Sequence, residues 1–106
     1  MRVLAGLVMA ALGATAAAAQ TGRLTDASYI QAARCVGLAS SSKLGSGDAA
    51  AMSAWFKTQA FGREAFVMDK ADEMQREAKR EADHASADRK PKLEAELSGA
   101  CAALKS

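Results

Sequence analysis

The amino-acid sequence predicts an all-helical fold: a small bundle of three to four helices, with one disulfide joining the first and last helices. Three observations lead to this prediction. Beyond residue 20, apolar side chains recur at spacings of three and four residues, and no segment alternates as a strand would. Glycines punctuate the chain between the helical stretches, at Gly45, Gly47 and Gly62. The only two cysteines fall in the first and last predicted helices.

Residues 1–19 have the order of a secretory signal peptide. Arg2 gives a basic start, residues 3–12 form an uncharged apolar run, and small residues follow it. A membrane-spanning helix needs about 20 apolar residues, a length that this segment approaches only if its alanines are counted. We therefore expect export from a bacterial cytoplasm, with cleavage between Ala19 and Gln20 or one to two residues away. An uncleaved anchor helix is the alternative.

After cleavage, the sequence predicts a flexible lead-in over residues 20–25 and a single helical domain over residues 26–106. The expected location is the periplasm or the cell exterior. The whole chain has a formal net charge of +2, and Arg2 is the only charged residue before the cut. Such a balance favours neither nucleic acid nor an anionic membrane as a partner. We expect no stable membrane insertion once the signal peptide has been removed.

Each predicted helix begins near a suitable capping residue. Thr25 or Asp26 can cap the first helix, Asp48 the second and Asp88 the last, because their side-chain oxygens can accept an N–H of the first turn. Pro91 is compatible with the first turn of the last helix. The predicted helices span about 26–40, 48–60, 63–86 and 89–104.

The helix over 63–86 is long and charged, with an apolar stripe along one side. This stripe consists of Val67, Ala71, Met74, Ala78, Ala82 and Ala85. The last helix has an apolar face formed by Leu93, Leu97, Ala100, Cys101 and Leu104. We expect that face to pack against the first-helix stripe of Tyr29, Ala32, Val36 and Ala39.

Two cysteines in an exported chain predict a disulfide between Cys35 and Cys101. The chain-entropy estimate for closing so long a loop is about 4 kcal/mol of stabilisation. Two buried thiols, or a bridge between two chains, are the alternatives.

The disulfide also constrains the path of the chain between its cysteines. A straight helix over 48–85 would be roughly 57 Å long, and tight loops would then leave the cysteines roughly 30 Å apart. A disulfide requires Cα atoms within about 7 Å of each other. We therefore expect the chain to bend at Gly62. The alternative is a helix continuous from residue 48, with the loop over 41–47 stretched out.

Trp55, Phe56 and Phe61 are the candidate partner-binding residues. Together with Tyr29 and Phe66 they make up all the aromatic residues of the chain, and all of them precede the charged half of the third helix. Their simplest interpretation is a hydrophobic core. The functional interpretation is a partly exposed aromatic patch that docks a partner or an apolar ligand.

Glu77, Glu81 and His84 are the candidate metal ligands. Glu81 and His84 form a Glu-x-x-His pair one helical turn apart, and Glu77 lies one turn earlier. Carboxylate-bridged metal sites use two such pairs and further glutamates from other helices, so a solvated charged face is the favoured interpretation and no metal is predicted. The sequence also lacks the motifs of nucleophilic, haem, dithiol and phosphate-binding sites. We expect neither an enzyme nor a cofactor.

These observations predict an exported helical protein that acts by protein–protein interaction in the cell envelope, as an adaptor, inhibitor or chaperone-like domain. Its partner would be an envelope protein that the sequence does not identify, and a homodimer is compatible with the pattern. The alternative is a carrier of a small ligand or metal, using the interior near Trp55 or the face of Glu77, Glu81 and His84.

Overall fold

The computed structural model describes residues 23–44 and 48–105. Its elements are α2 (Asp26–Ser40), α3 (Ala49–Thr58), α4 (Ala65–Asp83), α5 (Arg89–Glu96), the π-helical turn η1 (Leu97–Cys101) and α6 (Ala102–Leu104). The last three run on from one another and are called the C-terminal segment. Throughout the described part the regular structure is helical, which confirms the predicted fold class. The predicted signal peptide over residues 1–19 lies outside the described residues and stays a prediction.

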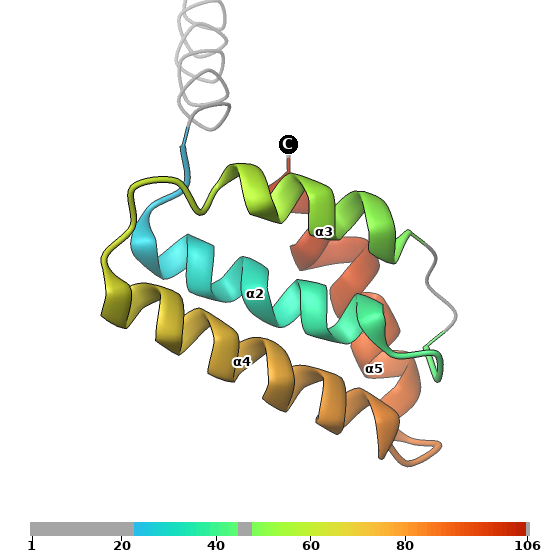
Figure 1. Ribbon diagram of the computed structural model, residues 1–106. Coiled ribbons are helices and arrows are strands. Elements are labelled where there is room, and N and C mark those ends of the chain that lie inside the picture. Colours follow the sequence, from blue (N-terminus) through green and yellow to red (C-terminus); the bar gives the residue numbers. More distant parts are fainter. Residues whose placement is uncertain (1–22, 45–47, 106) are drawn as a thin grey trace, which may run out of the picture.

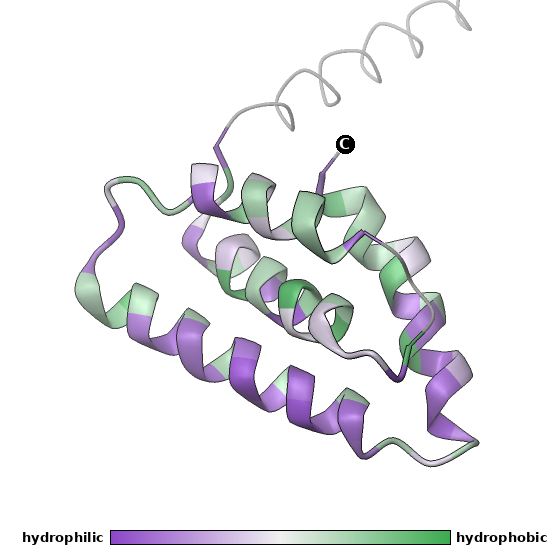
Figure 2. Ribbon diagram, turned by 45° about the vertical axis from the view of Figure 1, so that its right-hand side comes forward, coloured by the Kyte–Doolittle hydropathy of each residue, from purple (hydrophilic) through white to green (hydrophobic). Residues whose placement is uncertain are grey.

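Helix α2 is the central element of the bundle. It lies between α3 and α4, and the C-terminal segment crosses near its second half (Figure 1). Its most extensive packing is against α4. The outer face of α4 is strongly hydrophilic, as its sequence pattern predicts (Figure 2). Within residues 23–44 and 48–105, none of the helices has the length and apolar character that a membrane crossing requires.

Two of the three predicted caps are confirmed. The Thr25 hydroxyl accepts the N–H of Ser28 at 3.1 Å, and the Asp48 carboxylate accepts the N–H of Ala51 at 3.1 Å. Asp88 makes no side-chain capping bond because its backbone is already helical, whereas a capping residue needs extended dihedrals. Ser86 takes this role instead, and its backbone oxygen and hydroxyl accept the N–H of Arg89 at 3.0 and 3.3 Å.

The helical run is interrupted between α3 and α4, as the distance limit for a Cys35–Cys101 disulfide predicted. Gly62 has a φ of +78°, in the left-handed region that glycine adopts without a steric penalty. The turn over residues 59–64 reverses the chain, so that α4 runs back beneath α2 (Figure 1). The alternative of a helix continuous from residue 48 is therefore wrong.

The core has two parts. The larger part surrounds the disulfide and contains Cys35, Val36, Leu38, Leu44, Met52, Ala78, Ala82, Leu93, Leu97 and Cys101. The smaller part contains Tyr29, Ala33, Val67 and Ala71. The expected packing of the whole α2 stripe against the last helix is therefore only half right. Val36 packs with residues of the C-terminal segment, as expected, but Tyr29 packs against α4.

The predicted disulfide is confirmed. Cys35 and Cys101 are joined, with their Cα atoms 5.7 Å apart, and both side chains are buried. In a straight α-helix, Cys101 would lie about 80° around the axis from Leu93. The wider turn of η1 offsets this rotation, so that Leu93, Leu97 and Cys101 face the core together. Ala100 is exposed as a result, and its predicted place on that face is wrong.

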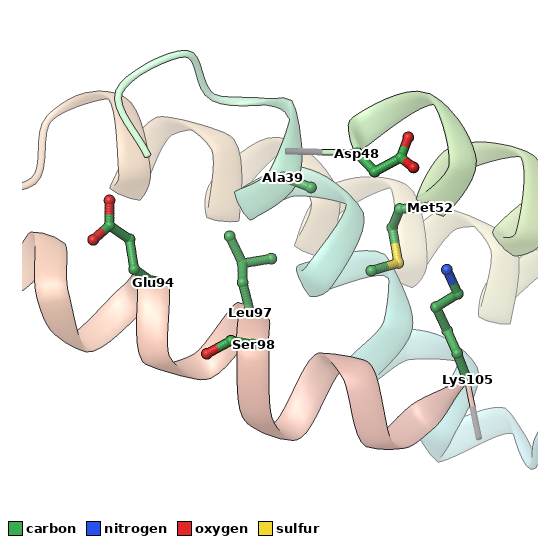
Figure 3. Close-up of a pocket in the computed structure, with 7 residues that line it drawn as sticks. All are labelled: Ala39, Asp48, Met52, Glu94, Leu97, Ser98 and Lys105. Carbon is green, nitrogen blue, oxygen red and sulfur yellow. The ribbon is translucent and has the colours of Figure 1, made fainter. Parts of the chain in front are cut away.

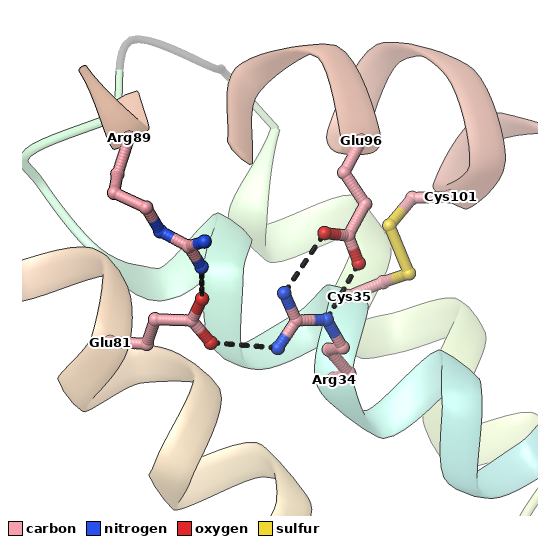
Figure 4. Close-up of polar contacts among 6 residues, drawn as sticks. All are labelled: Arg34, Cys35, Glu81, Arg89, Glu96 and Cys101. Atoms are coloured by element: carbon pink, nitrogen blue, oxygen red, sulfur yellow. Dashed lines mark hydrogen bonds and ion pairs between the residues drawn. A yellow bond between two sulfur atoms is a disulfide. The ribbon is translucent and has the colours of Figure 1, made fainter. Parts of the chain in front are cut away.

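A polar clamp lies beside the disulfide and ties three helices together (Figure 4). Arg34 of α2 donates two hydrogen bonds to Glu96 of α5, from Nε at 2.6 Å and from Nη2 at 2.9 Å. It also donates from Nη1 to Glu81 of α4 at 2.9 Å, and Arg89 pairs with the same carboxylate. These contacts hold the pKa of the Glu81 carboxyl below its usual value, chiefly through the hydrogen bond from Arg34.

Candidate functional site

The turn between α3 and α4 is fixed by one buried side chain, that of Arg63. Its Nε donates to the backbone oxygen of Gln59 at 2.8 Å, and its Nη2 donates to the backbone oxygen of Leu24 at 2.7 Å. Its Nη1 pairs with Asp26 at 2.7 Å, and only 2% of the side chain is exposed. Arg63 therefore joins the turn to the start of α2 and to the chain that enters it.

Leu24 is also held from the other direction, because its N–H donates to the side chain of Gln59 at 3.0 Å. Leu24 and Thr25, which the sequence placed in a flexible lead-in, thus have defined contacts. Residues 20–22 of that lead-in lie outside the described part.

The Arg63 side chain packs on two stacked aromatic rings. The guanidinium lies over the Tyr29 ring, with Cζ 4.5 Å from the ring centroid. Tyr29 in turn stacks on Phe56 of α3, with centroids 4.6 Å apart and planes within 8°. Burial raises the pKa of the Tyr29 hydroxyl, which donates to the Met68 sulfur at 3.5 Å. The side chains that lie under the turn between α3 and α4 are therefore closely packed.

Two phenylalanines project from this packed end into solvent. Phe61, in the turn, is 83% exposed, and Phe66, in the first turn of α4, is 68% exposed. We call this pair the aromatic tip. Singly exposed apolar side chains are ordinary, whereas a contiguous exposed apolar patch often marks an interaction site, which makes this pair the candidate for one.

The three predicted partner-binding residues are not brought together as one exposed patch. Trp55 and Phe56 are partly buried and pack against the core, whereas Phe61 points into solvent. Phe66, which was not among the predicted site residues, is the second exposed ring. The sequence contained a signal for it, because Phe66 lies one residue away from the stripe that begins at Val67 and therefore outside the buried face of α4.

The candidate metal ligands do not share a site. Glu81 is held between two guanidinium groups, while Glu77 and His84 are exposed on and just after α4. A carboxylate that already pairs with two arginines is a poor metal ligand, because binding a cation would break those pairs. In the portion that the structure describes, no three histidine, cysteine or acidic side chains are grouped as a metal site requires.

The other carboxylate with a lowered pKa also has a structural cause. Asp83 accepts a hydrogen bond from the Ser41 hydroxyl at 2.6 Å and pairs with Lys79 at 3.0 Å, and both contacts lower the pKa of its carboxyl. This contact joins the end of α2 to the end of α4. Neither Glu81 nor Asp83 has the environment of a general acid or base, because such a group needs its pKa raised toward neutrality.

Comparison with known proteins adds no relative. No family model, no curated protein and no solved structure matches the chain.

Proposed function

We propose that the protein is an exported binding module of the bacterial envelope, acting by protein–protein interaction through its aromatic tip. The observation that supports this proposal is the exposure of Phe61 and Phe66 beside a turn that Arg63 holds in place. A docking residue on a fixed turn loses little conformational freedom on binding, so more of its burial energy is available as affinity.

The aromatic tip is suited to anchoring a protein–protein contact, but tight binding requires that additional protein surface be buried with it. Full burial of a phenylalanine is worth about 1.5–3 kcal/mol, so the pair offers about 3–6 kcal/mol before the cost of association. Such an energy suits an adaptor, an inhibitor or a chaperone-like domain whose partner also covers neighbouring polar surface. An aromatic anchor with a polar rim is the usual arrangement of binding hot spots.

A photo-cross-linking amino acid at position 61 tests the proposal in the organism's own envelope. The expected result is one discrete adduct, absent when the cross-linker is placed at position 100, which is exposed on the C-terminal segment. Phe66→Ser should reduce that adduct, and it should leave the unfolding temperature unchanged because the ring is in solvent. The intact mass of the purified exported protein should also lack residues 1–19.

Adducts of equal yield from both positions would overturn the proposal, and so would a complete absence of adducts at position 61. If Phe66→Ser left the position-61 adduct at full yield, the two rings would not act as one tip.

A further inference from the structure

A separate cleft opens on another side of α2, between α3 and the C-terminal segment (Figure 3). Its volume is about 460 Å³, within the usual range of sites for small molecules. Met52 of α3 and Leu97 of η1 form an apolar floor together with Ala39 of α2. The cleft exists because α3 and the C-terminal segment both pack on α2 rather than closely on each other.

The charged groups of the cleft are arranged in order along it. Glu94 lies at one end and Lys105 at the other, with Leu97 and Ser98 between them (Figure 3). Asp48, on the opposite wall, adds a second carboxylate. A complementary ligand therefore has an apolar middle, a positive end for Glu94 and a negative end for Lys105.

We infer that this cleft binds a short apolar peptide with free ends, its ammonium group beside Glu94 and its carboxylate beside Lys105. Glu94 can bind the ligand ammonium in addition to its contact within the protein, because a carboxylate has about four lone-pair sites and accepts several hydrogen bonds at once. The inference goes beyond the proposed function, since Phe61 and Phe66 take no part in it.

The length of the ligand follows from the helix geometry. Glu94 and Lys105 are eleven positions apart on one helical segment, which places their backbones roughly 16 Å apart. Both side chains are long enough to lean toward each other and shorten this span. An extended peptide of three to four residues covers about 10–14 Å. A tripeptide such as Ala-Leu-Ala is therefore a suitable probe.

The test is an NMR titration of the isotopically labelled exported protein with Ala-Leu-Ala, its C-terminal amide and its N-acetyl form. Saturable shifts are expected at the methyl groups of Met52 and Leu97 and at the amide of Ser98. The free tripeptide should bind better than either blocked form. Each exposed ion pair contributes up to about 1 kcal/mol, so each blocked end should weaken binding by about two- to five-fold.

Two variants assign the ends of the ligand. Lys105→Met should weaken binding of the free tripeptide by the same factor and leave the amide unaffected. Glu94→Gln should weaken the free tripeptide and the amide and leave the acetylated form unaffected. Lys92→Met, which removes an exposed lysine outside the cleft, is the matched control and should change no affinity.

Equal affinity for all three peptides would overturn the inference, as would shifts that do not saturate. A loss of binding in Lys92→Met as large as that in Lys105→Met would indicate attraction to net charge alone and would also refute it. None of these variants should alter cross-linking from position 61, so this result and that of the proposed function are independent.

Discussion

Replacing Gly37 by alanine tests the closest approach between two helices of the fold. An alanine Cβ at this position would lie 2.2 Å from the backbone oxygen of Gln75 and 2.8 Å from Cβ of Ala78. Neither group can rotate away, since one belongs to the backbone of α4 and the other is attached directly to it. Relief of the contact with Gln75 therefore requires α2 and α4 to separate by about 1 Å.

Two opposing effects determine the size of the change. Alanine is favoured over glycine inside a helix by about 1 kcal/mol. Overpacking of a close-packed contact costs about 1–3 kcal/mol and sometimes more, and here it falls on the most extensive interface of the bundle. Because a 2.2 Å approach is far inside van der Waals contact, the overpacking cost lies at the upper end of this range, and we expect Gly37→Ala to lower the free energy of unfolding by about 2 kcal/mol in total. For a domain of this size, that corresponds to a fall of about 8–16 °C in the unfolding temperature.

The assay is thermal and urea unfolding followed by circular dichroism, with Gly99→Ala as the matched control. A Cβ at Gly99 would meet nothing within 4 Å, so this change should keep the helical benefit and raise stability by about 0.5–1 kcal/mol. Opposite signs for the two variants are the expected result. Stabilisation by both would mean that α2 and α4 do not approach as closely as described.

Three further perturbations address the bend, the disulfide and the polar clamp. Gly62→Ala should lower stability by about 1–2 kcal/mol in urea unfolding, because its φ of +78° is unfavourable for alanine, and a gain of stability would contradict the break. Reduction of the Cys35–Cys101 bond should shift the urea midpoint by an amount equivalent to about 4 kcal/mol, and non-reducing peptide maps of monomeric protein should show the two cysteines linked. The lowered pKa of Glu81 adds stability above its usual pKa of 4.5, and this contribution should be lost as the pH falls through the lower folded value. Arg34→Met should flatten this acid dependence, and an unchanged pH profile would show that the clamp does not control it.

The helix pattern of the chain could be predicted because its causes lie within a few residues. The cap at Thr25 and the apolar spacing set the bounds of the first helix, which the structure reproduces from Asp26 to Ser40. The bend at Gly62 could be predicted by combining one helix length with one distance limit for a disulfide. Both arguments use only local geometry and a single long-range link.

The remaining features depend on which elements lie opposite one another, and a single sequence does not supply that information. Spacing placed Tyr29 on the buried stripe but could not show that it would stack on Phe56 and support Arg63. In the sequence, Arg34 is one of many charged helix residues. Its role depends on α4 and α5, which place the carboxylates of Glu81 and Glu96 beside it. The candidate site was half predicted for the same reason, since exposure of Phe61 depends on how its turn is held.

The disulfide links a cysteine of the first described helix to one in the last few residues of the chain, 66 positions later. If the chain is exported from its N-terminus, as proposed, Cys35 would reach an oxidising compartment before Cys101. Helices α2, α3 and α4 can meet during that interval, while Cys35 remains a thiol at the site where the C-terminal segment has still to dock. In that order of events the bond would form only after the segment that carries Cys101 has docked, and a thiol-trapping agent added during export would separate bridged molecules from those in which Cys35 is still a thiol.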